Sequence, residues 1–349
     1  MGLKICIVSE AIERPFDEGV KIFVYNLIKE LAKHFTVLGL SRSGSFEGGI
    51  EKFCTKALPE NKLLLSLYLW KKIKLFKPDL IYYIPTACAT VFALLRAKIL
   101  KLYGNGAKTV MITLQPREYN AITKKIIPFI VPDLVLAQSV KTRNVLCSLG
   151  CKVKIIATGV DLQKYTPVSK KIKESLRKKH GFPASKFIVL HVGHINRNRN
   201  AQIMKDIQDI NGVQAIIVGS TSYPEDRYLA EELKNANVIV ITSFIENIEE
   251  IYQSVDCYLF PVFSAGACTE IPLSVFEAMA CNLPIVSTKF QGLPHLVKNQ
   301  DDFAYVNTTN DVIPMIKSIR EISRPQTRNL IERYSWENVI EQVVSDSIA

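Results

Sequence analysis

The chain of 349 residues contains no run of about eighteen uncharged apolar residues, the length that a membrane-spanning helix needs. One candidate segment, from Ile84 to Leu95, stops at Arg96. The first residues also lack the charged region, long apolar region and small-residue cleavage site of an export signal, because a strand pattern begins at Lys4. These absences predict a protein that stays in the cytoplasm.

Several nucleotide-binding and metal-binding motifs are missing as well. Neither G-x-G-x-x-G after a strand nor G-x-x-x-x-G-K-[ST] occurs, which argues against a dehydrogenase and a P-loop enzyme. There is no Asp-x-Asp, and the eight cysteines form no C-x-x-C pair. We therefore expect the cysteines to be small buried hydrophobic residues and not zinc ligands or disulfides.

Basic residues are unevenly distributed along the chain. Residues 1–150 hold 22 Lys and Arg against 11 Asp and Glu, so the totals of 44 and 33 leave 22 against 22 for the remainder. The whole excess of +11 thus lies in the N-terminal half. It favours an anionic partner, either a phosphorylated substrate or a membrane surface, although a well-solvated lysine-rich surface explains it equally well. Nucleic acid is disfavoured, because no recognised nucleic-acid-binding motif is present.

Short apolar runs alternate with helical patterns along both halves of the chain. Residues 4–8, for example, are followed by apolar residues at helical spacing from Val20 to Leu31. The other apolar runs are residues 35–40, 80–84, 109–114, 134–137, 187–192, 215–218, 238–241, 257–260 and 284–287. Continuous apolar runs separated by helices predict parallel sheets covered on both faces. The expected fold class is α/β, with two doubly wound, Rossmann-like domains.

A polar stretch from residue 166 to residue 185, with two prolines and a basic cluster, interrupts this pattern. We place the domain junction there. The predicted domains are residues 1–165, residues 166–335 and a final helix of residues 336–349. Because open α/β sheets bind ligands at the carboxyl ends of their strands, we expect the two domains to face each other across a cleft that holds the site.

The segment from Leu63 to Lys77 has two interpretations. Its lysines and Trp70 are typical of a helix that lies on a bilayer surface. Its polar residues do not collect on one face of a helical wheel, however, so a partly buried helix between two strands is favoured.

A phosphate-binding arrangement follows the apolar run at residues 187–192. Gly193 forms a turn, and the next loop carries Arg197 and Arg199 ahead of a helix. Glycine lets backbone amides approach oxygen atoms, and an arginine can hold a diphosphate by two hydrogen bonds. The alternative is that both arginines are solvated surface residues.

A second candidate element begins at Gly266. A glycine-bearing loop opens a helix near Pro272, and Glu277 lies on that helix. A carboxylate near a helix start can accept hydrogen bonds from ribose or sugar hydroxyls, while the helix amides face a phosphate. The alternative for Glu277 is an exposed helix residue.

These residues resemble a known family. The segment from Pro272 to Val286 looks like the signature helix of glycosyltransferase family 4, whose members are retaining, nucleotide-sugar-dependent enzymes of the GT-B fold. Residues 19–27 are similar to the family's first loop and helix, residues 158–162 to its hinge motif and residues 334–337 to the start of its last helix. In that fold the last helix usually crosses back to the N-terminal domain.

The resemblance implies a role for each matching position. Arg199 would bind the donor diphosphate, with Gly193 beside it and Gly19 approaching from the N-terminal domain. Glu277 would bind the ribose. Phe244 and Ile245 would contact the nucleobase through their backbone. The transferred sugar and its phosphate would be contacted by Glu270, Ile271 and Pro272. Arg199 and Glu270 are the expected catalytic residues.

Four positions depart from the family pattern, namely Glu18, Gln115, His194 and Thr269. Because His194 stands where the family has an arginine, we expect Arg197 to share the phosphate role. Gln115 stands where a histidine is usual, and glutamine cannot shuttle a proton. Glu270 comes one residue after the position of the family's first glutamate, which Thr269 occupies.

The reaction that the resemblance implies is a metal-independent, front-face transfer of a hexose or N-acetylhexosamine from a UDP- or GDP-linked sugar. A donor phosphate oxygen helps to take the acceptor proton, so no cofactor and no metal are expected. The basic N-terminal domain favours an anionic acceptor, either a lipid phosphate at the inner face of the membrane or a soluble phosphorylated molecule. A non-catalytic sugar-nucleotide-binding subunit and a nucleotide-sugar epimerase of the same fold are the alternatives.

Overall fold

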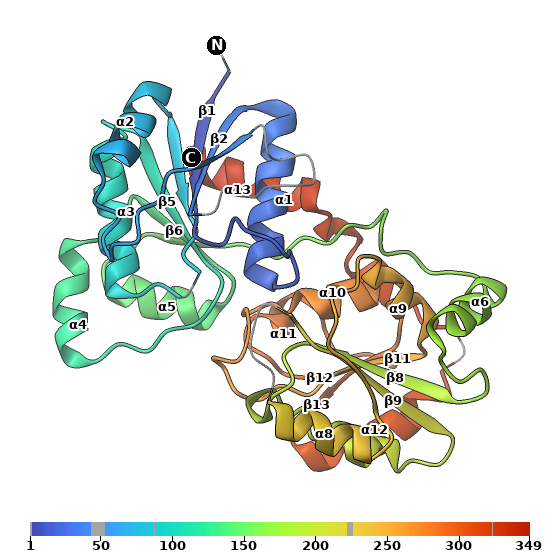
Figure 1. Cartoon of the computed structure of the whole chain (residues 1–349). Coiled ribbons are helices and arrows are strands. Elements are labelled where there is room, and N and C mark those ends of the chain that lie inside the picture. The colour runs from blue at the N-terminus through green and yellow to red at the C-terminus, as the bar shows by residue number, and fades with distance from the viewer. Residues whose placement is uncertain (1, 43–52, 87, 222–225, 323) are drawn as a thin grey trace. The chain divides into compact units, whose positions relative to one another are not determined.

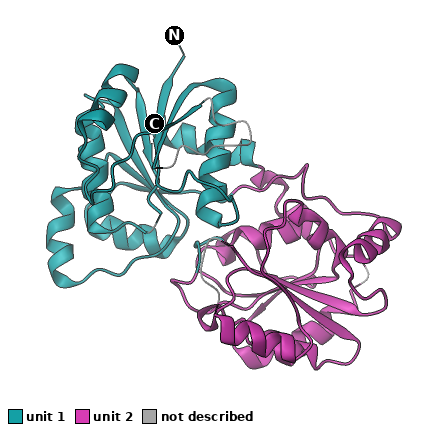
Figure 2. Ribbon diagram, viewed as in Figure 1, with its two compact units in different colours: residues 1–158, 268–271, 336–349 teal, residues 159–267, 272–335 magenta. Residues whose placement is uncertain are grey.

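The computed structural model describes residues 2–42, 53–86, 88–221, 226–322 and 324–349. The chain divides into two compact units (Figure 1, Figure 2). Unit 1 comprises residues 1–158, 268–271 and 336–349, and unit 2 comprises residues 159–267 and 272–335. The chain leaves unit 1 after Thr158, and the polar stretch from residue 166 lies within unit 2.

Unit 1 contains a seven-stranded parallel sheet among its described residues, in the order β3-β2-β1-β4-β5-β6-β7. Its strands are β1 (Lys4–Val8), β2 (Thr36–Ser41), β3 (Cys54–Lys56), β4 (Leu80–Tyr83), β5 (Lys108–Thr113), β6 (Leu134–Ala137) and β7 (Val153–Ile155). The central strands β4 and β6 are buried along their whole length, which explains their continuous apolar sequences. The strand order reverses at β1, so the crevice between β1 and β4 is the switch point of this sheet.

Helices cover both faces of this sheet. They are α1 (Gly19–His34), α2 (Leu67–Phe76), α3 (Val91–Tyr103), α4 (Ala121–Ile126), the short helix η2 (Ile127–Phe129), α5 (Val140–Ser148) and α13 (Trp336–Ile348). Tyr83 points into the core beneath α2 and α3, whereas its neighbour Tyr82 donates a hydrogen bond of 3.0 Å to Ser347 of α13. Trp336 also meets Phe23 of α1 edge to face, with ring centroids 5.6 Å apart. The final helix is therefore part of unit 1.

Unit 2 contains a six-stranded parallel sheet among its described residues, in the order β10-β9-β8-β11-β12-β13. Its strands are β8 (Phe187–Val192), β9 (Val213–Val218), β10 (Ile239–Ile241), β11 (Cys257–Phe260), β12 (Ile285–Thr288) and β13 (Phe303–Val306). Its helices include α6 (Lys170–His180), η3 (Arg197–Arg199), α7 (Ile203–Gln208), α8 (Arg227–Asn235), α9 (Ile248–Ser254), α10 (Leu273–Ala280), α11 (Leu293–Leu296) and α12 (Val312–Ile319). The prediction of two doubly wound α/β domains is confirmed.

The cysteines and the hydrophobic helices add two findings. None of the eight cysteines forms a disulfide, and six of them are buried as expected. Cys54 is half-buried and Cys147 is exposed on α5, so the expectation of burial is wrong at these two positions, because they lie on an edge strand and on an outward helix face. Within the described ranges, no helix is long and apolar enough to cross a membrane.

Candidate functional site

The switch point of the unit 2 sheet holds Gly193 and Arg199. Strand β8 lies between β9 and β11, and Gly193 follows it directly. A Cβ at Gly193 would lie 2.6 Å from Nη1 of Arg199, so only a glycine lets this guanidinium lie against the backbone. Arg199 is half-buried, and its Nε donates a hydrogen bond of 3.1 Å to the carbonyl of Ala267. Its terminal nitrogens have no protein acceptor among the residues that the structure describes, so they can bind an anion.

Arg197 takes a different direction. Its Nη2 donates a hydrogen bond of 2.9 Å to Oε1 of Glu232 on α8, and both side chains are exposed. The structure therefore brings Gly193 and Arg199 together and engages Arg197 elsewhere. Its share in phosphate binding stays a prediction.

His191 on β8, which the sequence analysis did not single out, lies behind the glycine turn. It is fully buried, and its Nδ1 lies 3.0 Å from the carbonyl of Leu259, which assigns the proton to Nδ1. Burial lowers the pKa of His191 to about 4, and the charge of Arg199 acts in the same direction. Nε2 has no partner in the described part of the chain, and a Cβ at Gly193 would lie 3.4 Å from it. A polar residue inside an otherwise apolar strand was the available sequence signal.

Glu277 on α10 is only 7% exposed, so the alternative of an exposed helix residue is wrong. Its Oε2 accepts a hydrogen bond of 2.8 Å from the hydroxyl of Tyr252 on α9. Burial raises the pKa of Glu277, and hydrogen bonds from Tyr252 and Tyr165 oppose that rise. These tyrosines fix the orientation of the carboxylate. No local sequence pattern indicates them, since both come from distant parts of the chain.

Tyr258 of β11 connects the end of β8 with the first turn of α10. Its hydroxyl donates a hydrogen bond of 2.6 Å to Oγ of Ser274 and lies 3.3 Å from the carbonyl of Val192. Pro272 is the N-cap residue of α10, and its side chain makes no capping bond. The first turn of α10 is thus held at the same edge of the sheet as Gly193.

Phe244 and Ile245 follow β10, the edge strand of the unit 2 sheet. Phe244 is 54% exposed, and Ile245 is half-buried. Strand β9 separates β10 from β8, so both residues share the carboxyl edge of the sheet with Gly193 without lying beside it. This position leaves their backbone contacts to a nucleobase as a prediction.

Gly19 and residues 268–271 belong to unit 1. Gly19 is the first residue of α1, and a Cβ there would lie 3.3 Å from both Oγ1 and Cγ2 of Thr269. This distance is tighter than ordinary van der Waals contact. Glycine therefore lets the loop at Thr269 approach the start of α1.

Glu270 is fully buried in unit 1, at the start of α5. Its Oε1 accepts hydrogen bonds from the hydroxyls of Ser139, at 2.5 Å, and Thr142, at 2.6 Å. Burial raises the pKa of Glu270, and these hydrogen bonds oppose the rise. Ile271 is buried beside it, with its amide 3.4 Å from Oε1 of Gln138. The expectation that Glu270 and Ile271 face the transferred sugar stays a prediction, since one carboxylate oxygen is already occupied.

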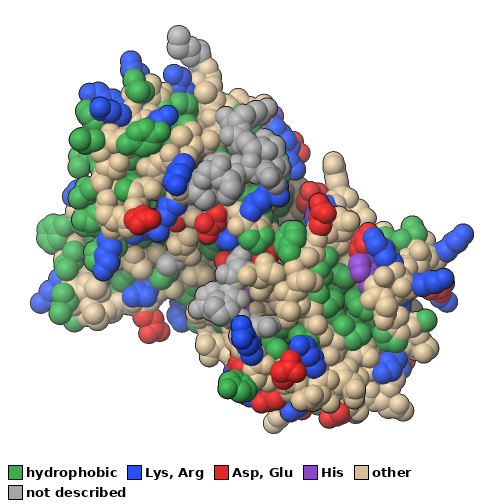
Figure 3. Space-filling view, viewed as in Figure 1, with side chains coloured by type: hydrophobic (Ala, Val, Ile, Leu, Met, Phe, Trp, Pro, Cys, Tyr) green, Lys and Arg blue, Asp and Glu red, His purple; other side chains and the backbone are tan. Residues whose placement is uncertain are grey.

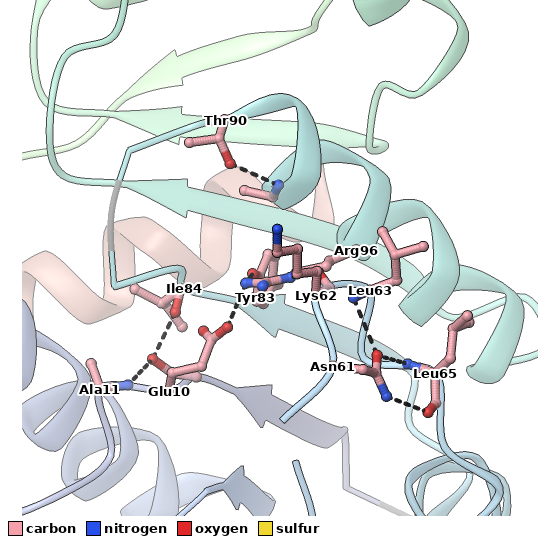
Figure 4. A network of polar contacts seen from close by, with 12 residues as sticks. Glu10, Ala11, Asn61, Lys62, Leu63, Leu65, Tyr83, Ile84, Thr90 and Arg96 are labelled. Carbon is pink, nitrogen blue, oxygen red and sulfur yellow. Dashed lines mark hydrogen bonds and ion pairs between the residues drawn. The ribbon is translucent and has the colours of Figure 1, made fainter. Parts of the chain in front are cut away.

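A buried ion pair lies at the switch point of the unit 1 sheet. Glu10 follows β1, and its Oε1 accepts a hydrogen bond of 2.6 Å from Nη1 of Arg96 on α3. The same nitrogen lies 3.1 Å from the hydroxyl of Tyr83, and Figure 4 shows these three side chains together. Oε2 of Glu10 is buried without a hydrogen-bond partner among the described residues. The sequence analysis missed this pair, because its members are 86 residues apart.

Two cavities lie near the strand ends. A cavity of about 230 Å³ in unit 2 is lined by residues at the carboxyl ends of β11, β12 and β13, among them Phe263, Thr288 and Val306. A cavity of about 610 Å³ in unit 1 lies at the amino ends of β5, β6 and β7, lined by Lys108, Leu134 and other residues. The second cavity is therefore at the opposite edge of the sheet from Glu10. No group of three or more possible metal ligands occurs in the part of the chain that is described.

Comparisons with known proteins agree with this architecture. Residues 186–324 match the family model of the glycosyl transferases group 1. The sulfoquinovosyl transferase of Arabidopsis thaliana is 24% identical over 299 residues, which cover 78% of this chain and 57% of that protein. The UDP-Gal:alpha-D-GlcNAc-diphosphoundecaprenol alpha-1,3-galactosyltransferase of Escherichia coli is 24% identical over 193 residues, 52% of this chain and 48% of that protein. The chain thus spans about half the length of these relatives.

Solved structures show the same fold. The HepE protein of Anabaena in complex with UDP-glucose superposes with a TM-score of 0.75 and 18% identity over 99% of both chains. The sucrose-phosphate synthase of Thermosynechococcus elongatus gives a TM-score of 0.79 and 18% identity over 98% of both chains. Two parallel sheets with interleaved helices, together with these matches, define the GT-B class. The family model covers residues 186–324, and these matches support a GT-B glycosyltransferase family, with which glycosyltransferase family 4 is consistent.

Proposed function

We propose that the protein is a retaining glycosyltransferase that moves a hexose or N-acetylhexosamine from a UDP- or GDP-linked sugar to an acceptor hydroxyl. The observation that carries the proposal is the guanidinium of Arg199, which is fixed against Gly193 at the switch point of the unit 2 sheet. The name of the E. coli relative specifies a UDP-linked donor, and the HepE structure contains UDP-glucose. Both support a nucleotide sugar as the substrate.

Arg199 and the first turn of α10 would stabilise the leaving diphosphate. A guanidinium can form two parallel hydrogen bonds to phosphate oxygens, and free amides at a helix start add positive potential. Both groups lie at one edge of the sheet, so they meet developing negative charge without rearrangement. Glu277, held by Tyr252, would accept hydrogen bonds from the ribose hydroxyls.

We propose that this transfer needs no metal, because Arg199 and the start of α10 supply the positive charge that a cation supplies in other transferases. Activity in the presence of EDTA is the test. Unchanged turnover is expected, and a strict requirement for added Mg²⁺ or Mn²⁺ would contradict it.

The acceptor would bind unit 1, at the crevice between β1 and β4. Glu10 lies at this crevice, where Arg96 holds its Oε1 and its Oε2 is buried without a hydrogen-bond partner among the described residues. The positive N-terminal half favours an anionic acceptor, either lipid-linked at the inner face of the membrane or soluble and phosphorylated. The name of the E. coli relative specifies a lipid-diphosphate acceptor, which supports the first form.

The proposal is tested by binding before turnover. UDP and GDP should raise the melting temperature of the protein, and UMP and GMP should do so much less, since Arg199 acts on the diphosphate. Equal shifts from mono- and diphosphates would contradict the assignment of Arg199. Release of sugar and nucleotide from the bound donor then tests catalysis.

A sugar-nucleotide-binding subunit without turnover is the second candidate. It is favoured by Glu270, whose carboxylate is engaged by Ser139 and Thr142 in unit 1. Donor binding without hydrolysis or transfer to any acceptor would support this candidate.

A further inference from the structure

Exposed large apolar side chains concentrate in one part of unit 1. Fourteen such side chains are exposed among the described residues, and nine of them lie between residues 65 and 129. The nine are Leu65, Leu67, Tyr68, Leu75, Phe92, Leu102, Ile122, Ile126 and Phe129. Leu67, Leu75 and Phe129 are each at least 75% exposed. They lie on α2, α3, α4 and η2 or directly before α2, and we refer to the nine as the α2–α4 face.

These helices cover the same face of the unit 1 sheet. Leu69 of α2, Leu94 of α3 and Ile127 of η2 all belong to one core cluster with the strands. Figure 1 shows α2, α3 and α4 along one side of unit 1. Lys98 of α3 also donates a hydrogen bond of 2.6 Å to the carbonyl of Phe129, which ties α3 to η2. The helices α2, α3 and η2 therefore cover one core, and α4 runs directly into η2, so the outward sides of these helices lie on the same side of unit 1.

The same stretch carries nearly all of the net charge of the protein. Residues 61–131 contain twelve Lys and Arg against two Asp and Glu, a net charge of +10 out of +11 for the whole chain. One of the two acidic residues, Asp79, accepts a hydrogen bond from the amide of Lys4. The helices α2, α3 and α4 contain no acidic residue at all. In Figure 3, basic and apolar side chains alternate over this part of unit 1.

A solvated lysine-rich surface does not require leucines that are more than 70% exposed, whereas an anionic bilayer uses both kinds of side chain. Apolar residues enter the region between headgroups and acyl chains, and the lysines meet lipid phosphates. Lys71 and Lys74 on α2, like Lys124 and Lys125 on α4, are exposed beside the apolar residues. Lys74 also lies over the ring of Trp70, 4.7 Å from its centroid, so an aromatic ring accompanies the charge.

We propose that the α2–α4 face docks unit 1 on an anionic lipid bilayer. The inference rests on the proposed function, because docking on a bilayer would bring the protein to a lipid-linked acceptor. Binding to lipid vesicles can nevertheless be measured on its own. The full chain should sediment with vesicles of phosphatidylcholine and phosphatidylglycerol at low salt. It should not sediment with vesicles of phosphatidylcholine alone, and increasing salt should release it.

Two sets of variants with matched controls test the surface. Lys71→Glu, Lys74→Glu and Lys125→Glu together should lower binding to anionic vesicles roughly a hundredfold, because each lysine at an anionic surface contributes about 1 kcal/mol. The control carries Lys170→Glu, Lys171→Glu and Lys178→Glu on α6 of unit 2, three exposed lysines, and should bind within about threefold of the wild type. Leu67→Ser with Leu75→Ser should weaken binding at least tenfold, whereas Tyr228→Ser, at an 87% exposed site on α8, should not.

Several outcomes would overturn the proposal. If the wild-type protein does not sediment with anionic vesicles at low salt, a bilayer is not the partner of the α2–α4 face. Equal losses from the two lysine triples show that net charge alone attracts the vesicles. A dimer that Leu67→Ser and Leu75→Ser convert to a monomer, with vesicle binding unchanged, shows that a second copy of the chain covers the face. RNA that outcompetes vesicles at equal phosphate concentration assigns the face to nucleic acid.

Binding of UDP and GDP by the same variants separates this inference from the proposed function. Variants that lose vesicle binding should keep wild-type nucleotide affinity and melting temperature, because every substituted side chain is exposed and lies outside unit 2's switch point. Vesicle binding without any nucleotide binding would contradict the proposed function and leave the docking surface intact.

Discussion

Unit 1 and unit 2 are built alike but differ in what their outer helices present. Both bury a parallel sheet of apolar strands beneath helices. On α6 of unit 2, basic side chains pair with acidic partners, as Lys173 does with Asp256 at 2.7 Å and Lys179 with Glu250 at 2.7 Å. On α2 and α4 of unit 1 there is no acidic residue, and leucine, isoleucine and lysine face outward. The helix faces that pack on the sheets are therefore alike in the two units. The helix faces that point to solvent differ between them.

The units also differ at their switch points. In unit 1 the buried carboxylate of Glu10 is paired with an arginine, whereas in unit 2 the buried carboxylate of Glu277 is held by tyrosines. Arg96 holds one oxygen of the Glu10 carboxylate, and the other oxygen is buried without a hydrogen-bond partner among the described residues. The tyrosines orient Glu277 while leaving the positive charge of Arg199 for a diphosphate. The proposed function has the donor bind at the switch point of unit 2 and the acceptor bind unit 1.

The largest expected effect tests whether α13 stabilises unit 1 alone. Trp336 is 5% exposed and packs on Phe23 of α1, so Trp336→Ala should destabilise unit 1 by about 3–5 kcal/mol. Hydrogen exchange should accelerate in β1 and β4 and remain unchanged in β8 and β9. The control is Trp70→Ala, at a half-buried position on α2, which should cost less. Faster exchange in both sheets would show that the two units unfold together.

The second prediction concerns the stability of unit 2 at low pH. Burial lowers the pKa of His191 to about 4, whereas an unfolded histidine binds a proton near 6.5. The stability that neutral His191 contributes is therefore fully present above pH 6.5. As the pH decreases toward 4, the free energy of unfolding falls by about 3 kcal/mol, because the unfolded histidine binds a proton and the folded one does not. His191→Gln should remove this pH dependence. Glu270 and Glu277, whose pKa values are raised, change stability with pH in the opposite direction, but they do so equally in both proteins. Their contributions therefore cancel when the unfolding free energy of the variant is subtracted from that of the wild type. Parallel stability curves for wild type and variant would contradict the buried neutral histidine.

A smaller effect compares two arginines of one loop. Arg199→Ala should weaken UDP or GDP binding by about 1.5–3 kcal/mol, the usual value of a charged hydrogen bond. Arg197→Ala should change it by less than about 0.5 kcal/mol, because Arg197 forms an exposed pair with Glu232. Titration calorimetry measures both. Equal losses would show that Arg197 leaves Glu232 and shares the diphosphate, as the sequence analysis predicts.

The sequence predicts the strands of the cores better than the strands of the edges. The ten predicted strands are all present, and the unpredicted ones are β3, β7 and β13, each at the edge of its sheet. Edge strands are short and partly solvated, as in β7, whose three residues Val153–Ile155 include a lysine and are all half-buried. β3 and β7 each contain a polar or charged residue and give no continuous apolar run, whereas β13 (Phe303–Val306) is an apolar run of four residues that the sequence analysis did not predict.

The candidate site follows the same rule. Gly193 and Arg199 were predictable because seven residues of one loop, 193–199, contain both the turn and the charge. The partners of Glu277 and Glu10 were not, since Tyr252 and Arg96 reach them only through packing of separate elements. Local chemistry can be found from sequence alone, and contacts between distant elements need the fold.

The smallest expected effect separates the structural role of Glu277 from its proposed role in ribose binding. Glu277→Ala removes the acceptor of the buried Tyr252 hydroxyl, so it should cost about 1–3 kcal/mol of stability in addition to any loss of function. Glu277→Gln keeps an amide oxygen for Tyr252 and should change stability by less than about 1 kcal/mol.

If the carboxylate binds ribose, however, Glu277→Gln should still weaken UDP or GDP binding roughly tenfold, since a neutral acceptor replaces a charged one. Tyr252→Phe is the matched control for the packing. Thermal unfolding and calorimetric titration of the three variants distinguish the roles: wild-type nucleotide affinity in a stable Glu277→Gln protein would leave Glu277 as a buried anchor of α10 and move the ribose contact to another residue of unit 2.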